Sequence, residues 1–107
     1  MTTFKDLALA LPLAEEMDHF GSASFRVAGK IFAQLSADGE TGLVKLTHDQ
    51  QAWAIATLPE ACAAEPQWGR HGWTRLKLSG LDEERVRDFL TQSWGATAPK
   101  KMRVLLG

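Results

Sequence analysis

The chain has 107 residues, of which 45% are hydrophobic and 23% charged, and its formal net charge is −1 at pH 7. These values are typical of one soluble globular domain spanning residues 1–107, and they give no global electrostatic attraction to nucleic acid. Because Cys62 is the only cysteine, the chain can form neither an intrachain disulfide nor a cysteine-based zinc site. No apolar run reaches the roughly 20 residues of a membrane helix, so we expect no membrane contact. We also expect a cytoplasmic monomer that holds no metal or other cofactor.

The N-terminal half predicts a helix followed by antiparallel strands. Thr2 or Thr3 can cap a first helix, which Pro12 ends. Residues 14–20 are interpreted as a short edge strand. Apolar and polar residues then alternate with a period of two in three runs, at 22–27, 30–35 and 42–46. Because the turns between these runs are short, beginning with Ala28-Gly29, the runs predict an antiparallel meander.

The C-terminal half predicts two helices around a further strand. Thr47 and Gln50 match a capping box, and the helix that follows should end before Pro59. Its inward residues are expected to be Ala52, Trp53, Ile55 and Ala56. A short helical turn holding Cys62 is expected at 60–65, and a strand at 73–78. Asp82 can cap a last helix, whose apolar face is predicted to be Val86, Phe89, Leu90, Ser93, Trp94 and Thr97.

The fold class that follows from these elements is α+β, a single domain with an antiparallel sheet flanked by helices. The strand and helix faces that should meet in the core can be read from their periodicities. The predicted shared core is Ile31, Ala33, Leu35, Leu76, Leu78, Val86, Phe89, Leu90 and Trp94.

Residues 67–78, QWGRHGWTRLKL, are the most probable contact surface. They contain two tryptophans and three basic residues but no acidic residue. Trp73, Arg75 and Lys77 alternate with Thr74, Leu76 and Leu78, so the first three side chains are expected on the outer face of a strand. Cations beside an aromatic ring are typical of a nucleic-acid surface. Three charges bind weakly alone, so further cations must contribute. The complete hypothetical set is Arg26, Lys30, Lys45, Arg70, His71, Trp73, Arg75 and Lys77.

Catalytic and metal sites are not indicated. His19, His48 and His71 are isolated in the sequence, so a structural or solvated role is favoured for each. Cys62 lies in no nucleophile motif and is interpreted as a small core residue. The turn from Gly69 to Gly72 could cradle an anion, although a simple loop corner is favoured. We therefore expect no enzymatic activity, and an enzyme or ligand binder built on this turn is the least favoured alternative.

Five stretches, covering nearly the whole chain, resemble the MmcQ/YjbR family of small bacterial proteins. They are LALALPLAEE (7–16), HFGSASFRVAGKIFAQL (19–35), VKLTHDQQA (44–52), WGRHGWTRLKL (68–78) and LDEERVRDFLTQSWGATAPKK (81–101). The resemblance implies an antiparallel sheet flanked by helices, similar to the frataxin-like (CyaY-like) fold. It also implies DNA binding, the label commonly given to this family, and it brings no catalytic residue.

Two functions are therefore expected from the sequence. The first is a non-enzymatic DNA-binding or regulatory module that presents a basic sheet face to duplex DNA. The second is a protein-interaction module that presents the sheet face, or the basic-apolar tail KKMRVLLG at 100–107, to a protein partner. A contiguous basic patch favours the first function, whereas a large exposed apolar patch favours the second.

Overall fold

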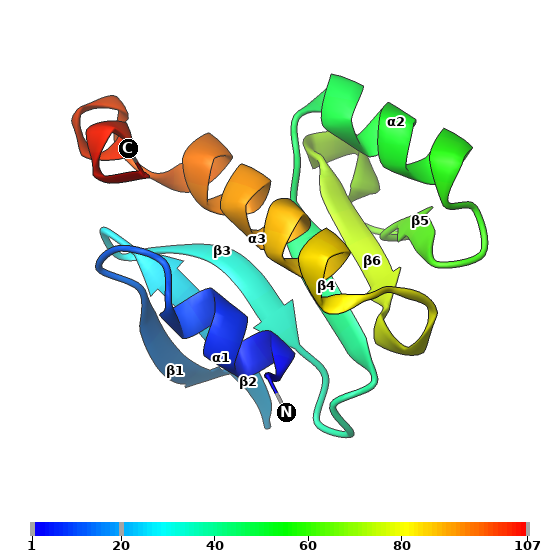
Figure 1. Ribbon diagram of the computed structural model, residues 1–107, viewed down its shortest axis with the longest axis horizontal. Coiled ribbons are helices and arrows are strands. Elements are labelled where there is room, and N and C mark those ends of the chain that lie inside the picture. The colour runs from blue at the N-terminus through cyan, green and yellow to red at the C-terminus, as the bar shows by residue number, and fades with distance from the viewer. Residues whose placement is uncertain (1, 20, 107) are drawn as a thin grey trace.

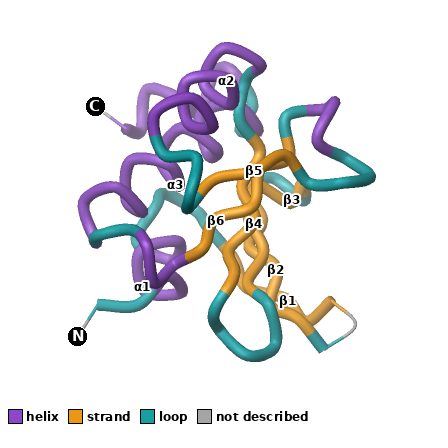
Figure 2. Tube along the Cα trace, turned by 90° about the vertical axis from the view of Figure 1, so that its right-hand side faces the viewer, coloured by secondary structure: helices purple, strands orange, loops and turns teal. Residues whose placement is uncertain are grey.

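The computed structural model describes residues 2–19 and 21–106, and within them it is a two-layer α+β domain (Figure 1). One layer is an antiparallel six-stranded sheet, and the three α-helices cover one side of it (Figure 2). The strands are β1 (Glu15–His19), β2 (Ser22–Val27), β3 (Lys30–Leu35), β4 (Thr41–Lys45), β5 (Cys62–Ala64) and β6 (Trp73–Lys77). The helices are α1 (Phe4–Leu9), α2 (His48–Thr57) and α3 (Glu83–Thr97).

The strands are arranged in the order β1-β2-β3-β4-β6-β5. The first four form the predicted meander, in which each strand pairs with the next along the chain. β6 then pairs with β4, and β5 occupies the outer edge beside β6. The predicted α+β class and the predicted edge strand are both confirmed; Phe20, the last residue of that predicted strand, lies outside the described residues.

Local capping interactions start each α-helix where the sequence predicts. Thr3 and Asp6 form a capping box at α1, and Thr47 and Gln50 form one at α2. The Asp82 carboxylate accepts the backbone N–H of Arg85 at 2.8 Å and caps α3. These side chains satisfy backbone donors that a helix cannot satisfy itself, so the helix starts are encoded locally.

The core lies between the sheet and α3. The buried residues of α3 are Val86, Phe89, Leu90, Ser93 and Trp94, which follow the predicted stripe. They pack with Phe25, Phe32, Val44 and Leu76 from the inner side of the sheet. The indole N–H of Trp94 donates to the Pro12 carbonyl at 2.9 Å, so the largest core side chain has its polar atom satisfied.

The inward face of β3 differs from the predicted one because the strand contains a β-bulge. Phe25 pairs with Ala33 but Arg26 pairs with Ile31, so Phe32 is an extra residue on β3. Two successive side chains, those of Phe32 and Ala33, are therefore both buried, and Ile31 lies outside the core. The strict alternation that predicted Ile31 in the core was wrong at this position.

The predictions for two neighbouring segments were also wrong. In α2 the buried residue is Ala54, and Gln51 and Ile55 are half-buried. Ile55 is thus partly inward as predicted, whereas Ala52, Trp53 and Ala56 are exposed. Trp53 is 47% exposed, and the Arg85 guanidinium lies 5.3 Å from its ring. The predicted helical turn at 60–65 is instead strand β5, because pairing with β6 overrides the helical preference of its alanines.

Among the described helices, none combines the length and the apolar character needed to cross a membrane.

Candidate nucleic-acid interface

The sheet surface opposite the described α-helices is the candidate site. Residues paired in register share a face, so the outward positions are those that alternate with the buried ones. We call these outward positions the open face: Glu15, Met17, Ser22, Ser24, Arg26, Ile31, Gln34, Thr41, Leu43, Lys45, Ala63, Trp73, Arg75 and Lys77. Ser24 belongs to this face by its register, although its side chain is buried.

Cations line the centre of the open face. On β6, Thr74 and Leu76 are buried while Arg75 and Lys77 are exposed and Trp73 is half-buried, so the predicted alternation is confirmed. The register places Lys45 of β4 beside Trp73. Ion pairs of the described residues join Lys5 to Glu16 and Arg87 to Glu83. None of the described open-face cations is therefore neutralised by an ion pair.

The other two predicted strand cations differ in their placement. Arg26 of β2 is on the open face, two strands from Lys45, with Glu15 as its neighbour on β1. Its Nε atom is buried and has no hydrogen-bond partner among the described residues. Lys30 is in register with the buried Val27, so it lies on the opposite side of the sheet at the β2–β3 turn. The structure therefore does not bring Lys30 to the open face.

The segment between β5 and β6, residues 65–72, projects past the open face (Figure 2). Glu65 organises its first turn: one carboxylate oxygen, Oε2, accepts the backbone N–H groups of Gln67 at 2.8 Å and Trp68 at 2.7 Å. The Glu65 carbonyl also accepts the N–H of Gly69 at 2.7 Å. This turn leads into a short 3-10 helix, η1 (Gly69–His71), whose Arg70 and His71 side chains are exposed.

Helix α2 holds the same segment from the other side. The Nε2–H of His48 donates to the Arg70 carbonyl at 2.8 Å, and the Gln51 amide donates to the carbonyls of Gly69 at 2.9 Å and Trp73 at 3.2 Å. The structural role predicted for His48 is confirmed by this bond. The segment is consequently fixed at several backbone positions, and Arg70 and His71 are presented next to the start of β6.

Gly72 makes the junction with β6 possible. Its φ is +94°, and a Cβ atom there would lie 1.9 Å from the Leu46 carbonyl oxygen. The backbone N–H of Leu46 donates to the Gly72 carbonyl at 2.9 Å. Only glycine allows this approach, which carries the β4 hydrogen bonding beyond Lys45 and positions Trp73.

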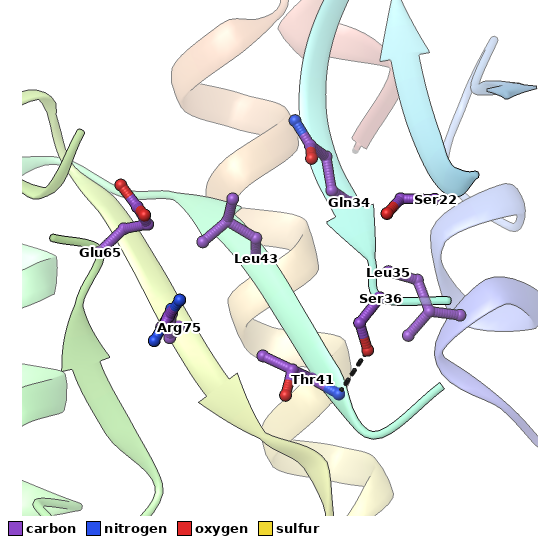
Figure 3. A pocket seen from close by; sticks show the side chains of 8 residues that line it. All are labelled: Ser22, Gln34, Leu35, Ser36, Thr41, Leu43, Glu65 and Arg75. Carbon is purple, nitrogen blue, oxygen red and sulfur yellow. Dashed lines mark hydrogen bonds between the residues drawn. The ribbon is translucent and has the colours of Figure 1, made fainter. Parts of the chain in front are cut away.

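A hollow of about 180 Å³ opens on the same surface (Figure 3). In Figure 3, α3 lies behind the strands, and Arg75, Leu43 and Gln34 come from three adjacent strands. The residues around the hollow are Ser22, Gln34, Leu35, Ser36, Thr41, Leu43, Glu65 and Arg75. A guanidinium, an amide and hydroxyls around it can bind an anionic oxygen such as that of a phosphate. The Glu65 carboxylate also lines the hollow, and its Oε2 atom is occupied by two backbone N–H groups.

Several residues of this surface were not predicted as site residues. Gln34, Thr41 and Leu43 reach the hollow because β3 and β4 are neighbours, and Glu65 reaches it from the end of β5. Their strand alternation could have identified the first three as outward-facing, whereas no sequence signal marks Glu65. Trp68, 54% exposed, was noted in the sequence but was not included in the predicted set.

The other side chains that could act as a nucleophile or as metal ligands do not form a site among the described residues. Cys62 is buried in the core cluster, as its interpretation as a core residue predicts. Within residues 2–19 and 21–106, no three His, Cys, Asp or Glu side chains are placed to share a metal ion. The side chain of His19 lies outside what the structure describes.

Comparisons with known proteins identify the family. The crystal structure of protein DR2400 from Deinococcus radiodurans, whose domain carries the family model DUF419, is similar to this chain with a TM-score of 0.77. The two share 17% sequence identity over 98% of this chain and 88% of that one, so this likeness concerns the fold. No curated protein matches the sequence. The YjbR family model matches residues 9–96, which is most of the chain, and the protein therefore belongs to the YjbR family.

Proposed function

We propose that this protein is a non-enzymatic, cytoplasmic DNA-binding or regulatory module, and that its open face contacts DNA phosphates. The binding would be largely independent of sequence, because the contacts are made by cations rather than by groups aimed at base edges. Lys45, Arg75 and Lys77 supply the central charges, while Arg70 and His71 extend the surface at the end of β6.

The observation that supports this proposal most strongly is the separation of charge. The chain as a whole has a net charge of −1. The open face and its hollow nevertheless carry four cations, Arg26, Lys45, Arg75 and Lys77, against two acids, Glu15 on β1 and Glu65 at the hollow. A sheet face with this balance attracts a polyanion locally even though the whole molecule does not. The hollow between Arg75 and Gln34 adds hydrogen-bonding groups at the centre of the same face.

A titration of a labelled DNA duplex at two salt concentrations tests the proposal. Each neutralised phosphate contributes about 0.9 to the slope of log affinity against log salt concentration, so three to four contacts predict a slope near −3. Absence of measurable binding at low salt would reject the proposal.

A second candidate function, binding of a protein partner, is favoured by the C-terminal segment. The 3-10 helix η3 (Lys100–Leu106) exposes three consecutive apolar side chains: Val104 is 76% exposed, Leu105 50% and Leu106 41%. Adjacent exposed apolar residues are typical of interaction sites. Replacing all three by serine separates the two functions, since it should leave DNA binding unchanged and abolish binding of a partner that uses this segment.

A further inference from the structure

Trp68 combines a fixed backbone with an exposed ring. Its N–H is held by Glu65, and its carbonyl accepts the N–H of His71 at 2.9 Å. The indole nevertheless remains 54% exposed, so its ring contributes little to the hydrophobic core. The Trp68 ring lies 6.3 Å from the His71 ring, at an interplanar angle of 34°. A pair of rings is thus presented on a rigid segment at the end of the open face.

Cations follow this ring pair in the sequence, and one acid, Glu65, holds the backbone N–H of Trp68. Arg70 lies between the two rings in sequence and is exposed, and residues 67–78 contain no acidic residue. Aromatic rings beside a cationic track are the elements that bind single-stranded nucleic acid, since the rings stack on bases and the cations hold the phosphates. In a paired duplex the bases are already stacked on one another, so an exposed ring can reach only unpaired ones.

Because its backbone is held by hydrogen bonds, the segment can present Trp68 to a ligand without first changing conformation. A segment whose backbone is already fixed loses little backbone freedom on binding, which increases affinity for a given contact area. Charge complementarity selects nucleic acid over an apolar protein segment, because Arg70, Arg75 and Lys77 accompany the ring along 67–78.

We propose that Trp68, together with His71, stacks on unpaired nucleobases, so that the protein binds single-stranded or partly unpaired nucleic acid in preference to a fully paired duplex. The proposal rests on the proposed function, because the open-face cations hold the phosphates on either side of the stacked base. It adds a preference that phosphate contacts alone do not provide, since phosphates are present in both forms.

Fluorescence anisotropy with two dye-labelled probes tests this inference: an oligothymidylate and a blunt duplex with the same number of nucleotides per strand. The parent should bind the oligothymidylate more tightly. Trp68→Ala should weaken that binding about tenfold, the equivalent of one lost stacking contact, while changing duplex binding less than about twofold. Trp68→Phe, which retains a ring, should recover most of the loss.

Trp53→Ala is the matched control, because Trp53 is exposed to a similar extent but belongs to α2, on the helix side of the sheet. It should leave both affinities unchanged. Equal affinity of the parent for both probes, or an equal loss for both in Trp68→Ala, would overturn the stacking inference and leave the proposed function standing. If the parent bound neither probe, both would be overturned, and the exposed ring would be assigned to a protein partner.

Discussion

Ser93 of α3 and Lys45 of β4 are joined by a hydrogen bond from the Lys45 backbone N–H to the Ser93 hydroxyl, at 2.8 Å. The same hydroxyl donates to the carbonyl of Phe32, the extra residue of the β3 bulge. The described register between β3 and β4 ends at Ala33 and Val44. The buried hydroxyl therefore satisfies two backbone groups just beyond the end of that register, and it fixes the backbone of an open-face cation from the opposite side of the sheet.

Ser93→Ala is expected to reduce the free energy of unfolding by about 2–6 kcal/mol, since two backbone groups, one buried and one part-buried, lose their partner at about 1–3 kcal/mol each. A urea melt measures the loss. Thr91→Ala is the control: its hydroxyl bonds to the Arg87 carbonyl within the same helix, and its removal should cost less than about 1 kcal/mol. Similar losses in the two variants would contradict the bridging role.

The β3 bulge is tested by comparing two neighbouring residues. Phe32→Ala should cost about 3–5 kcal/mol, as expected for a fully buried aromatic side chain. Ile31→Ala should cost only about 1 kcal/mol, because Ile31 lies outside the core. The measurement is again the free energy of unfolding in urea. A larger loss at Ile31 than at Phe32 would restore the simple alternation and argue against the bulge.

Gly72 should tolerate no side chain. In Gly72→Ala the new Cβ would collide with a backbone atom, the Leu46 carbonyl oxygen, so no rotamer change relieves the contact. We expect a loss of more than about 2 kcal/mol in thermal or urea unfolding. Gly29→Ala is the matched control, because Gly29 also has a positive φ, +79°, but open space around it. That variant should cost about 1–2 kcal/mol, the strain of the left-handed backbone alone.

Cys62 gives a prediction for alkaline pH. Burial raises the pKa of its thiol, so the folded state favours the neutral form more than the unfolded state does. Stability from this group is fully present below the unfolded pKa and is lost as the pH rises above it. Between pH 7 and pH 10 the urea midpoint of the parent should therefore fall further than that of Cys62→Ala. Equal falls would show that the thiol ionises alike in both states.

Much of the fold could be predicted because its signals are local. Thr47 and Gln50 interact across three residues, and the alternation of Trp73, Arg75 and Lys77 against Leu76 follows from strand geometry alone. The outward direction of these three side chains was consequently correct. The family resemblance implied the same antiparallel sheet, and the match over residues 9–96 confirmed the family.

The features that could not be predicted depend on partners distant in the sequence. The bulge at Phe32 is accompanied by a hydroxyl 61 residues away. The inward face of α2 differs from the predicted one because Gln51, which was not among the predicted inward residues, donates to two backbone carbonyls of the neighbouring segment. Lys30 lies on the side of the sheet away from the open face, because it is paired in register with the buried Val27. Individual charges can be counted in a sequence, but their convergence on one face depends on such pairings.

The most direct test of the account is the salt dependence of duplex binding in an Arg75→Ala/Lys77→Ala variant. If both cations contact phosphates, the slope of log affinity against log salt concentration should flatten by roughly two units relative to the parent. Stability should change by less than about 0.5 kcal/mol, because both side chains are exposed. Lys100→Ala/Lys101→Ala carries the same change in charge on the exposed η3 and should leave the slope unaltered. An unchanged slope in the β6 variant, or an equal flattening in both variants, would contradict the assignment of DNA binding to the open face.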